Sequence, residues 1–394
     1  MRELKRVLYV FDNVNYMSGA QRATFYQMEC LHKRYMIDVL TLSKPDRTVE
    51  IPGNVLEHKQ LWEETDAYTH NFWDIMLSKT PFFLKAKRFL YVIAMRLGRG
   101  ECFLDHFLYN KIEDDLEVYD AIIVVSEASK LKGLIGKLKN PKKIQWIHTD
   151  YAAWSDFSEW TRMVTKKDSK VYKDFDAIVV LSEHCKDGII QKISDIDNKV
   201  FVIPNLVNVE NIRKKAEENN EINFPEVGYK FITVGRIDRE KNFWCILEIC
   251  KKLKRDRFDF CWFIVGDGPM KKDVEQRIKE SGLSGNVKLL GRLENPYPIM
   301  KKSDYFVLLS TYEGTPVTID ECVVLNIPII ATAVGGIREQ LERYNTGNLL
   351  DLNDDIYKKF IDIITTHKET ANSISIETLN IINQKKIIQV LEDR

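Results

Sequence analysis

The stretch 310–322 reads STYEGTPVTIDEC, and it holds two glutamates, Glu313 and Glu321, eight positions apart. It follows an apolar run at 305–309 that is typical of a buried strand. Thr315 is a candidate N-cap and Pro316 a candidate first helical residue, which places Glu321 about two turns into a helix. The stretch is therefore predicted to be a strand–loop–helix junction with one carboxylate in the loop and the other on the helix.

Both parts of this junction suit a phosphorylated polyol. An ionised carboxylate accepts several hydrogen bonds, as a sugar with many hydroxyls requires. The free N–H groups and the positive dipole at a helix start suit a phosphate. The alternative is an ordinary loop followed by a solvated glutamate on a helix, and the spacing alone leaves that alternative open.

Working outward, short apolar runs rich in β-branched residues alternate with helical patterns along the whole chain. Such runs are typical of strands buried on both faces of a parallel sheet, with helices between them. A polar segment at 208–229 separates two series of runs, and the domain boundary is predicted at residue 205, within Pro204-Asn205-Leu206. The predicted strands are 7–11, 37–42, 121–125, 144–147, 177–181, 200–203, 231–234, 260–265, 287–290, 305–309 and 327–331.

Length and composition agree with two α/β domains in an intracellular protein. The chain has 394 residues, and 58 Lys and Arg balance 58 Asp and Glu, so no net charge favours nucleic acid as a partner. The seven cysteines form no C-x-x-C pair, which suggests reduced core thiols. The N-terminus lacks a signal-peptide pattern, and no apolar run reaches the roughly 18 residues of a membrane span. A cytoplasmic location is expected.

The stretch 235–242, GRIDREKN, supplies two cations between a predicted strand and a predicted helix. Arg236 offers a planar fork and Lys241 a point charge, a combination suited to a diphosphate. The alternative is a basic loop that pairs with Asp238 and Glu240.

Three further features follow predicted strands or lie near them. In VGDGP, at 265–269, the dinucleotide fingerprint fails because Lys271 occupies the position of its third glycine. His148 follows the strand at 144–147, where open parallel sheets bind ligands, although a lone histidine is also often a packed residue. Asp195-Ile196-Asp197 has an Asp-x-Asp spacing, but it lies in a polar turn, and no metal site is predicted there.

The segment 81–99, PFFLKAKRFLYVIAMRLGR, contains five basic residues and no acidic one. Its apolar residues fit one helical stripe. A basic amphipathic helix of this kind can lie on an anionic membrane surface. The alternative is a helix that faces the core and keeps its basic side in solvent.

Taken together, these residues resemble the family 4 retaining glycosyltransferases of the GT-B fold, and the resemblance covers nearly the whole chain. The pieces that carry it occur in the order of the family: SGAQR (18–22), WIHTD (146–150), VLSEH (180–184), VIPNLVN (202–208), VGRIDREKN (234–242), IVGDGP (264–269), LLGRL (289–293), SDYFVLLSTYEGTPVTIDEC (303–322) and PIIATAVGGIRE (328–339). Each piece alone is weak, whereas their order and spacing together are specific.

The resemblance implies a fold and two domains. It implies an α/β protein with two Rossmann-like domains whose parallel sheets face a central cleft. Residues 1–205 are expected to be the acceptor-side domain and residues 206–377 the domain that binds the nucleotide-sugar donor. A C-terminal helix at about 378–394 is expected to cross back to the first domain.

The resemblance also implies roles for single residues. Arg236 and Lys241 match the pair that neutralises the donor diphosphate. Glu313 matches a glutamate beside the transferred sugar, and His148 a histidine near the reacting carbon. Glu321 matches the glutamate that binds the ribose hydroxyls. The other expected donor-binding residues are Gly19, Gly235, Gly266, Leu293, Gly314, Thr315, Pro316 and Val317.

The implied reaction transfers a sugar from a nucleotide diphosphate donor to an acceptor hydroxyl with retention at the anomeric carbon. No metal or other cofactor is expected, and a UDP-sugar is the first choice of donor. The acceptor is expected to be a glycan or a lipid-linked glycan of a bacterial surface polysaccharide or glycolipid. In that case the protein is expected at the inner face of the plasma membrane.

The chain departs from the family pattern at two positions, and three other functions remain as alternatives. Ser18 stands where the family often has a first glycine, and Cys322 where alanine is usual. The first alternative function is that of a non-catalytic GT-B subunit, which binds nucleotide and supports a partner. A sugar epimerase of the same fold and an NAD-dependent dehydrogenase are the other two readings, and the broken glycine fingerprint disfavours the dehydrogenase.

Overall fold

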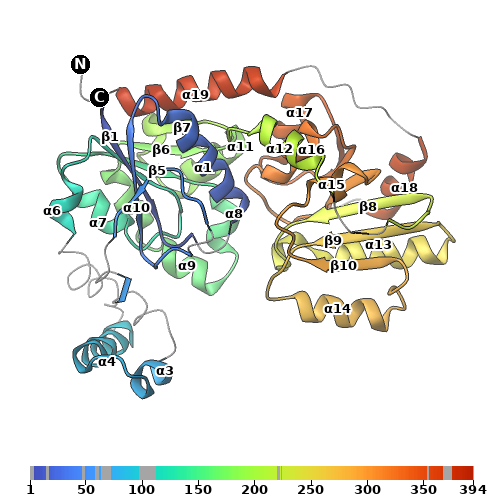
Figure 1. The fold of residues 1–394 in the computed structure, drawn as a ribbon, viewed down its shortest axis with the longest axis horizontal. Helices are drawn as coiled ribbons and strands as arrows, with labels where there is room; N and C mark the ends of the chain where they lie inside the picture. The colour runs from blue at the N-terminus through green and yellow to red at the C-terminus, as the bar shows by residue number, and fades with distance from the viewer. Residues whose placement is uncertain are drawn as a thin grey trace. The chain divides into compact units, whose positions relative to one another are not determined.

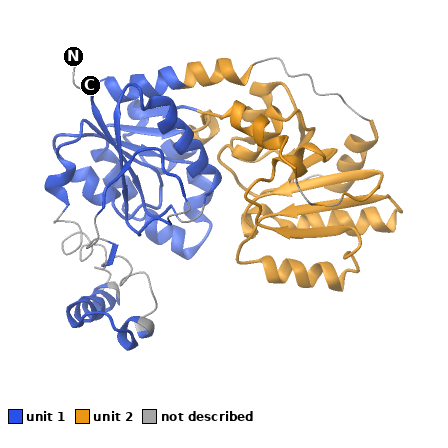
Figure 2. Ribbon diagram, in the orientation of Figure 1, with its two compact units in different colours: residues 1–180, 188–203, 384–394 blue, residues 181–187, 204–383 orange. Residues whose placement is uncertain are grey.

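The computed structural model describes residues 4–14, 17–46, 49–57, 62–63, 72–96, 112–219, 222, 224–352, 355–366 and 375–393. The chain forms two compact units, which Figure 2 shows in different colours. The first unit contains residues 1–180, 188–203 and 384–394, and the second contains residues 181–187 and 204–383. Apart from residues 181–187, the chain passes to the second unit at Pro204, two residues before the expected start of the second domain at 206, and returns to the first at Gln384.

The first unit is built on a seven-stranded sheet with the order β3-β2-β1-β4-β5-β6-β7, and its paired strands run parallel. The chain winds outward from β1 in one direction and then from β4 in the other, which is the doubly wound arrangement. The strands are β1 (Arg6–Phe11), β2 (Met36–Thr41), β3 (Asn54–Val55), β4 (Ala121–Val124), β5 (Lys142–Trp146), β6 (Ala177–Val180) and β7 (Val200–Val202).

Side-chain caps begin several helices of the first unit where the sequence provides them. Ser18 caps α1 in a reciprocal capping box with Gln21, Asp150 caps α8, and Ser158 caps α9. Ser18 therefore has a structural role at the position where the family often has glycine. The helices are α1 (Gly19–Leu31), α3 (Phe72–Leu77), α4 (Phe82–Arg96), α6 (Glu113–Leu116), α7 (Lys132–Lys137), α8 (Tyr151–Asp156), α9 (Glu159–Thr165), α10 (Asp168–Val171) and α11 (Glu183–Lys192).

The second unit is built on a six-stranded parallel sheet with the order β10-β9-β8-β11-β12-β13. Its strands are β8 (Tyr229–Val234), β9 (Phe260–Val265), β10 (Val287–Gly291), β11 (Tyr305–Leu308), β12 (Ile329–Thr332) and β13 (Asn348–Leu350). Figure 1 shows helices on both sides of this sheet. They are α12 (Val209–Ala216), α13 (Phe243–Arg255), α14 (Lys271–Glu280), α15 (Tyr297–Lys301), α16 (Val317–Val324), α17 (Ile337–Tyr344), α18 (Ile356–Thr366) and the start of α19 (Ile376–Glu392).

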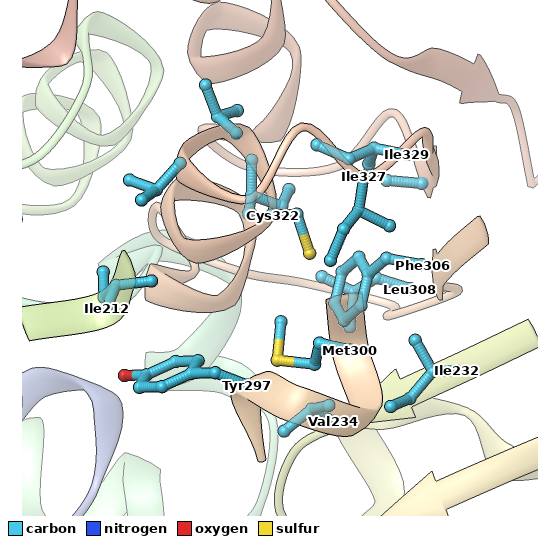
Figure 3. Close-up of a cluster of buried hydrophobic side chains, with 14 of the residues drawn as sticks. Ile212, Ile232, Val234, Tyr297, Met300, Phe306, Leu308, Cys322, Ile327 and Ile329 are labelled. Atoms are coloured by element: carbon cyan, nitrogen blue, oxygen red, sulfur yellow. The ribbon is translucent and has the colours of Figure 1, made fainter. Parts of the chain in front are cut away.

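Alternation along β9 divides the core of the second unit into two layers. Cys261 and Phe263 belong to the cluster that includes α12, α15, α16 and α17, part of which Figure 3 shows. Trp262 and Ile264 belong to the cluster that includes α13, α14 and α18. Successive side chains of a strand point to opposite faces, so an apolar run buries both faces of the sheet at once.

Each of the eleven predicted strands is present, and the prediction of two α/β domains with parallel sheets is confirmed. The prediction missed β3 and β13, which contain two and three residues. The C-terminal helix is α19, which begins in the second unit and ends in the first.

Candidate functional site

Two cationic residues follow β8, as the sequence predicts. Asp238 begins a 3-10 turn at Arg239–Lys241, and its carboxylate accepts a hydrogen bond of 2.7 Å from the Arg239 N–H. Asn242 then takes a left-handed conformation with φ 51° before α13 begins. The Arg236 side chain is 68% exposed, and its Nε lies 3.2 Å from Asp238 Oδ2. The turn therefore fixes the backbone of Lys241 and leaves the Arg236 guanidinium in solvent.

The structure joins the two motifs through Lys241 and Glu313. Lys241 Nζ donates a hydrogen bond to Glu313 Oε1, although the two residues are 72 positions apart. Ser310 Oγ donates to the same carboxylate oxygen at 2.6 Å. The Thr311 N–H donates to the Glu240 carbonyl at 2.8 Å, which ties the loop after β11 to the loop after β8. The Glu313 side chain is only 13% exposed, and the paired cation lowers the cost of placing this carboxylate in a sheltered site.

Two glycines hold the loop that carries Glu313. Gly335 has φ +53°, and a Cβ atom there would lie 1.7 Å from the Glu313 carbonyl oxygen. The Gly336 N–H donates to the Gly314 carbonyl at 2.9 Å. Glycine is required at Gly335 both by its left-handed backbone and by this close approach. Both glycines lie in the motif PIIATAVGGIRE at 328–339, but the motif alone does not predict this structural role.

The helix that carries Glu321 begins one residue later than predicted. Pro316 is the N-cap of α16, in an extended conformation with ψ 124°, and Val317 is the first helical residue. Thr315 is not the N-cap: its Oγ1 is buried and has no hydrogen-bond partner within the described part of the chain. An N-cap at Thr315 requires Pro316 to be helical, and because Pro316 is extended the prediction for Thr315 is wrong. Glu321 is the fifth residue of α16, so it lies just over one turn into the helix and not two.

Glu321 is 1% exposed, and the Tyr297 hydroxyl donates to its Oε1 at 3.0 Å. The neighbouring Asp320 faces a different set of partners: its Oδ1 accepts from Gln340 Nε2 at 2.6 Å and from the Tyr344 hydroxyl at 2.7 Å. Burial raises the pKa of Asp320 to about 6, and the two donors partly offset that rise. Donors from α15 and α17 therefore hold two adjacent carboxyl groups of α16.

The residues expected to line the nucleotide pocket lie on chain segments in close contact. Gly266 has φ +151°, and a Cβ atom there would lie 1.8 Å from the Gly235 carbonyl oxygen. The Gly266 N–H donates to the Gly291 carbonyl at 2.8 Å, which joins the ends of β9 and β10. Leu293, two residues further, is partly buried against the core cluster of Figure 3. The glycines thus allow three strand ends to approach one another.

Gly19 and His148 belong to the first unit, whereas the other predicted site residues belong to the second. Gly19 is the first residue of α1. His148 is half-buried, and neither ring nitrogen has a hydrogen-bond partner among the described residues. Burial lowers the pKa of His148 to about 4, so the ring is neutral at physiological pH.

A glutamate that no sequence motif predicts lies beside His148. The His148 N–H donates to Glu127 Oε2 at 3.4 Å, and Lys132 Nζ donates to the Glu127 carbonyl at 2.8 Å. Burial raises the pKa of Glu127 to about 7. Glu127 matches no motif, and its position shortly after the predicted strand 121–125 was the one signal for it. No metal site is predicted at Asp195, and its carboxylate pairs with Lys173 Nζ at 2.8 Å.

The fold and the joined motifs define the class of protein, and comparisons with known proteins agree. The crystal structure of the Anabaena protein HepE in complex with UDP and glucose is similar, with a TM-score of 0.68 and 15% sequence identity over 99% of this chain and 100% of that one. At this level of identity the likeness shows the fold, which is GT-B: two Rossmann-like domains with parallel sheets.

The family follows from the sequence comparisons. Residues 214–378 match the model of the family described as "Glycosyl transferases group 1". An uncharacterized glycosyltransferase of Methanocaldococcus jannaschii is 26% identical over 216 residues, 54% of this chain and 53% of that protein. A Campylobacter jejuni enzyme, named N-acetylgalactosamine-N,N'-diacetylbacillosaminyl-diphospho-undecaprenol 4-alpha-N-acetylgalactosaminyltransferase, is 29% identical over 189 residues, 48% of this chain and 50% of that enzyme. The part of the chain at 214–378 is therefore similar to the group 1 glycosyltransferases, and the recognition made from the motifs is confirmed. The chain spans about half the length of these curated relatives.

Proposed function

We propose that this protein is a retaining glycosyltransferase that moves a sugar from a nucleotide diphosphate donor to the hydroxyl of a glycan or lipid-linked glycan. The observation that carries the proposal is the pairing of Lys241 with Glu313, which brings a cation and a sheltered carboxylate from two motifs to one place. The Campylobacter relative acts, by its name, on an acceptor linked to diphospho-undecaprenol. HepE was crystallised with UDP and glucose, which supports a UDP-sugar as the donor.

In the proposed mechanism the second unit binds the donor. Arg236 and Lys241 take the diphosphate, so Lys241 exchanges its pairing with Glu313 for a phosphate oxygen. Glu313 then accepts hydrogen bonds from the transferred sugar, and Glu321 from the ribose. The backbone from Gly314 to Val317 lies where the helix start of α16 favours negative charge.

In the chemical step the departing diphosphate gains negative charge, and Arg236 and Lys241 stabilise that charge. The bond between the anomeric carbon and the diphosphate oxygen breaks as the acceptor oxygen bonds to the same face of that carbon. The acceptor proton passes to the departing phosphate, which leaves the sugar configuration retained. Removing a single fixed contact that stabilises developing negative charge lowers the rate by roughly 10²–10³-fold. Arg236 and Lys241 supply such contacts in this scheme, so we expect turnover to continue in the presence of EDTA.

A nucleotide panel followed by a transfer assay tests the proposal. Thermal unfolding is measured with UDP, GDP, ADP, CMP and NAD and with the matching nucleotide sugars, for wild type and for Glu321→Ala. A ligand present at 100 times its dissociation constant stabilises a protein by about 2.7 kcal/mol, a shift of several degrees. One nucleoside diphosphate should stabilise wild type and do so less in the variant, and its sugar conjugate should be transferred or hydrolysed. Binding without any turnover would favour the non-catalytic subunit, and stabilisation by NAD alone would favour the dehydrogenase.

We infer that the protein works at the cytoplasmic face of a membrane and binds it through α3 and α4. No helix in the described part of the chain is long and apolar enough to span a membrane. The alternative, in which segment 81–99 faces the core, does not hold where the structure describes the segment, because the apolar stripe of α4 is exposed. Residues 97–99 lie outside the described residues. The exposed apolar residues of the two helices are Trp73, Leu77, Phe82, Phe83, Phe89, Leu90 and Ile93.

The contacts within this helical pair explain why the stripe is exposed. Leu84 of α4 packs against Ile75 of α3 in a separate small cluster, so the side of α4 that carries Leu84 faces α3. Lys85 Nζ donates to the carbonyls of Met76 and Ser78 at 2.9 and 2.8 Å, which joins the two helices. The side of α4 that carries Phe82, which is 84% exposed, therefore faces solvent. Such a patch beside several basic residues suits an anionic lipid surface.

Vesicle co-sedimentation tests the membrane proposal. Wild type should bind phosphatidylglycerol vesicles at low salt. Each phenylalanine that leaves water contributes about 1.5–3 kcal/mol, so Phe82→Ser with Phe89→Ser should weaken binding at least about tenfold. Val118→Ser is the matched control, since Val118 is also exposed, at 57%, but lies outside the helical pair. Absence of wild-type binding at low salt would refute this part of the proposal, and equal losses in the control would show an unspecific effect.

A further inference from the structure

The strongest feature that the proposed mechanism does not use is the tyrosine that contacts Glu321. Tyr297 is the first residue of α15, and its side chain is 6% exposed. Its hydroxyl donates to Glu321 Oε1 at 3.0 Å from an element 20 residues before α16. No motif that carries the family resemblance includes Tyr297, since the matching pieces end at Leu293 and resume at Ser303.

Both the backbone and the ring of Tyr297 are held in place. The Tyr297 N–H donates to Asn295 Oδ1 at 3.2 Å, and Asn295 Nδ2 donates to the Lys215 carbonyl at 2.8 Å, at the end of α12. The ring belongs to the apolar cluster that includes Cys322. Figure 3 shows the ring at the margin of the cluster, with its hydroxyl oxygen directed away from Met300 and Val234. The hydroxyl is therefore presented to Glu321 by a rigid support.

We propose that Tyr297 is a positioning residue that holds the Glu321 carboxylate in the orientation that recognises a ribose diol. An ionised carboxylate has about four acceptor positions on its two oxygens. A donor that occupies one position on Oε1 fixes the rotation of the carboxylate plane and leaves the remaining positions aimed in set directions. Preorganisation of this kind reduces the entropy lost when the ligand binds. Tyr297 thereby contributes to the preference for a ribonucleotide over a nucleotide without ribose hydroxyls. This inference rests on the proposed ribose role of Glu321.

The test compares two ligands on three proteins and on one control variant. The ligands are UDP and 2′,3′-dideoxy-UDP, or the corresponding pair of whichever nucleoside diphosphate stabilises wild type most. The proteins are wild type, Tyr297→Phe and Glu321→Gln, and titration calorimetry gives the dissociation constants. The phenylalanine keeps the ring in the apolar cluster and removes only the hydroxyl, so the variant is expected to fold.

Wild type should bind the ribonucleotide at least about tenfold more tightly than the dideoxy ligand, because hydrogen bonds to a charged group are strong. Glu321→Gln should lose most of that preference. Tyr297→Phe should lower it by about 3- to 10-fold, the range expected for one hydrogen bond. It should do so through weaker binding of the ribonucleotide alone, with the dideoxy affinity unchanged.

Tyr344→Phe is the matched control. It removes a hydroxyl that donates to the adjacent carboxyl of the same helix, Asp320, at 2.7 Å. This control should lower the unfolding temperature and leave the ligand preference at the wild-type value.

Two outcomes overturn the inference while the proposed function stands: a preference in Tyr297→Phe equal to wild type, or equal weakening of both ligands, which would show a purely structural role. Failure of wild type to bind any nucleoside diphosphate would instead refute the proposed function itself.

Discussion

Replacing Gly335 with alanine tests whether the loop after β11 must keep its present position for activity. Gly335 is in the left-handed region with φ +53°, where a residue with a side chain costs about 1–2 kcal/mol. The new methyl group would lie 1.7 Å from the Glu313 carbonyl oxygen and 2.8 Å from its carbonyl carbon. Both contacts are to backbone, so the Glu313 loop must move by more than about 1 Å, because a packed interior leaves no free space.

Gly335→Ala is expected to reduce turnover more strongly than it reduces the free energy of unfolding. A misplacement of about 1 Å in a positioning group lowers turnover by about 10²-fold. A destabilisation of 1–2 kcal/mol lowers the unfolding temperature of a unit of this size by about 2–8 °C. The assay is the steady-state transfer of a labelled sugar, with thermal unfolding of the same preparation.

Two further variants make the result decisive. Gly285→Ala is the control, because a Cβ atom there meets nothing within 4 Å. Ser310→Ala removes the 2.6 Å hydrogen bond to Glu313 without a clash, so it should slow turnover several-fold even if Gly335→Ala proves too unstable to assay. Turnover within threefold of wild type in both Gly335→Ala and Ser310→Ala would refute the reasoning that the position of Glu313 limits catalysis.

Three other predictions follow from the same contacts. Lys241→Ala should lower turnover by about 10²–10³ and leave the circular dichroism spectrum unchanged, since the residue is sheltered but not in a core cluster; wild-type turnover would remove it from the mechanism. Arg236→Lys keeps the charge and loses the fork, so the dissociation constant for the nucleoside diphosphate should rise by up to about tenfold in calorimetry, and an unchanged constant would exclude fork-like binding. Asp320, whose pKa rises to about 6 on burial, binds a proton in the folded state at a pH where the unfolded chain has lost it, so folding stability should fall as pH rises from about 4 to 6. Asp320→Asn should remove about 3 kcal/mol of that fall in denaturant titrations at pH 4 and 7, and an unchanged difference would place the titration elsewhere.

The long buried strands were predictable because local composition controls them. Runs such as 260–265 are apolar on both faces, and each such run forms a strand in one of the two parallel sheets. β3 and β13 were missed because they read NV and NLL, short segments that begin with asparagine, a residue depleted in strands, whereas the equally short β7 reads VFV. The start of α16 was misplaced by one residue, since both Thr315 and Pro316 are acceptable at a helix start and only the conformation of the proline decides between them.

The sequence by itself determined eleven of the strands and their order along the chain, the two-unit organisation and the family resemblance, because these depend on patterns that are local or ordered along the chain. Only the tertiary structure decided which side chains meet. The pairing of Lys241 with Glu313, the packing of Gly335 against the Glu313 loop and the contact of Tyr297 with Glu321 each join segments that are far apart in sequence. Glu127 likewise became a candidate only beside His148, where burial by neighbouring elements raises its pKa. Contacts and burial of this kind arise from the packing of several elements, so no stretch of sequence contains them alone.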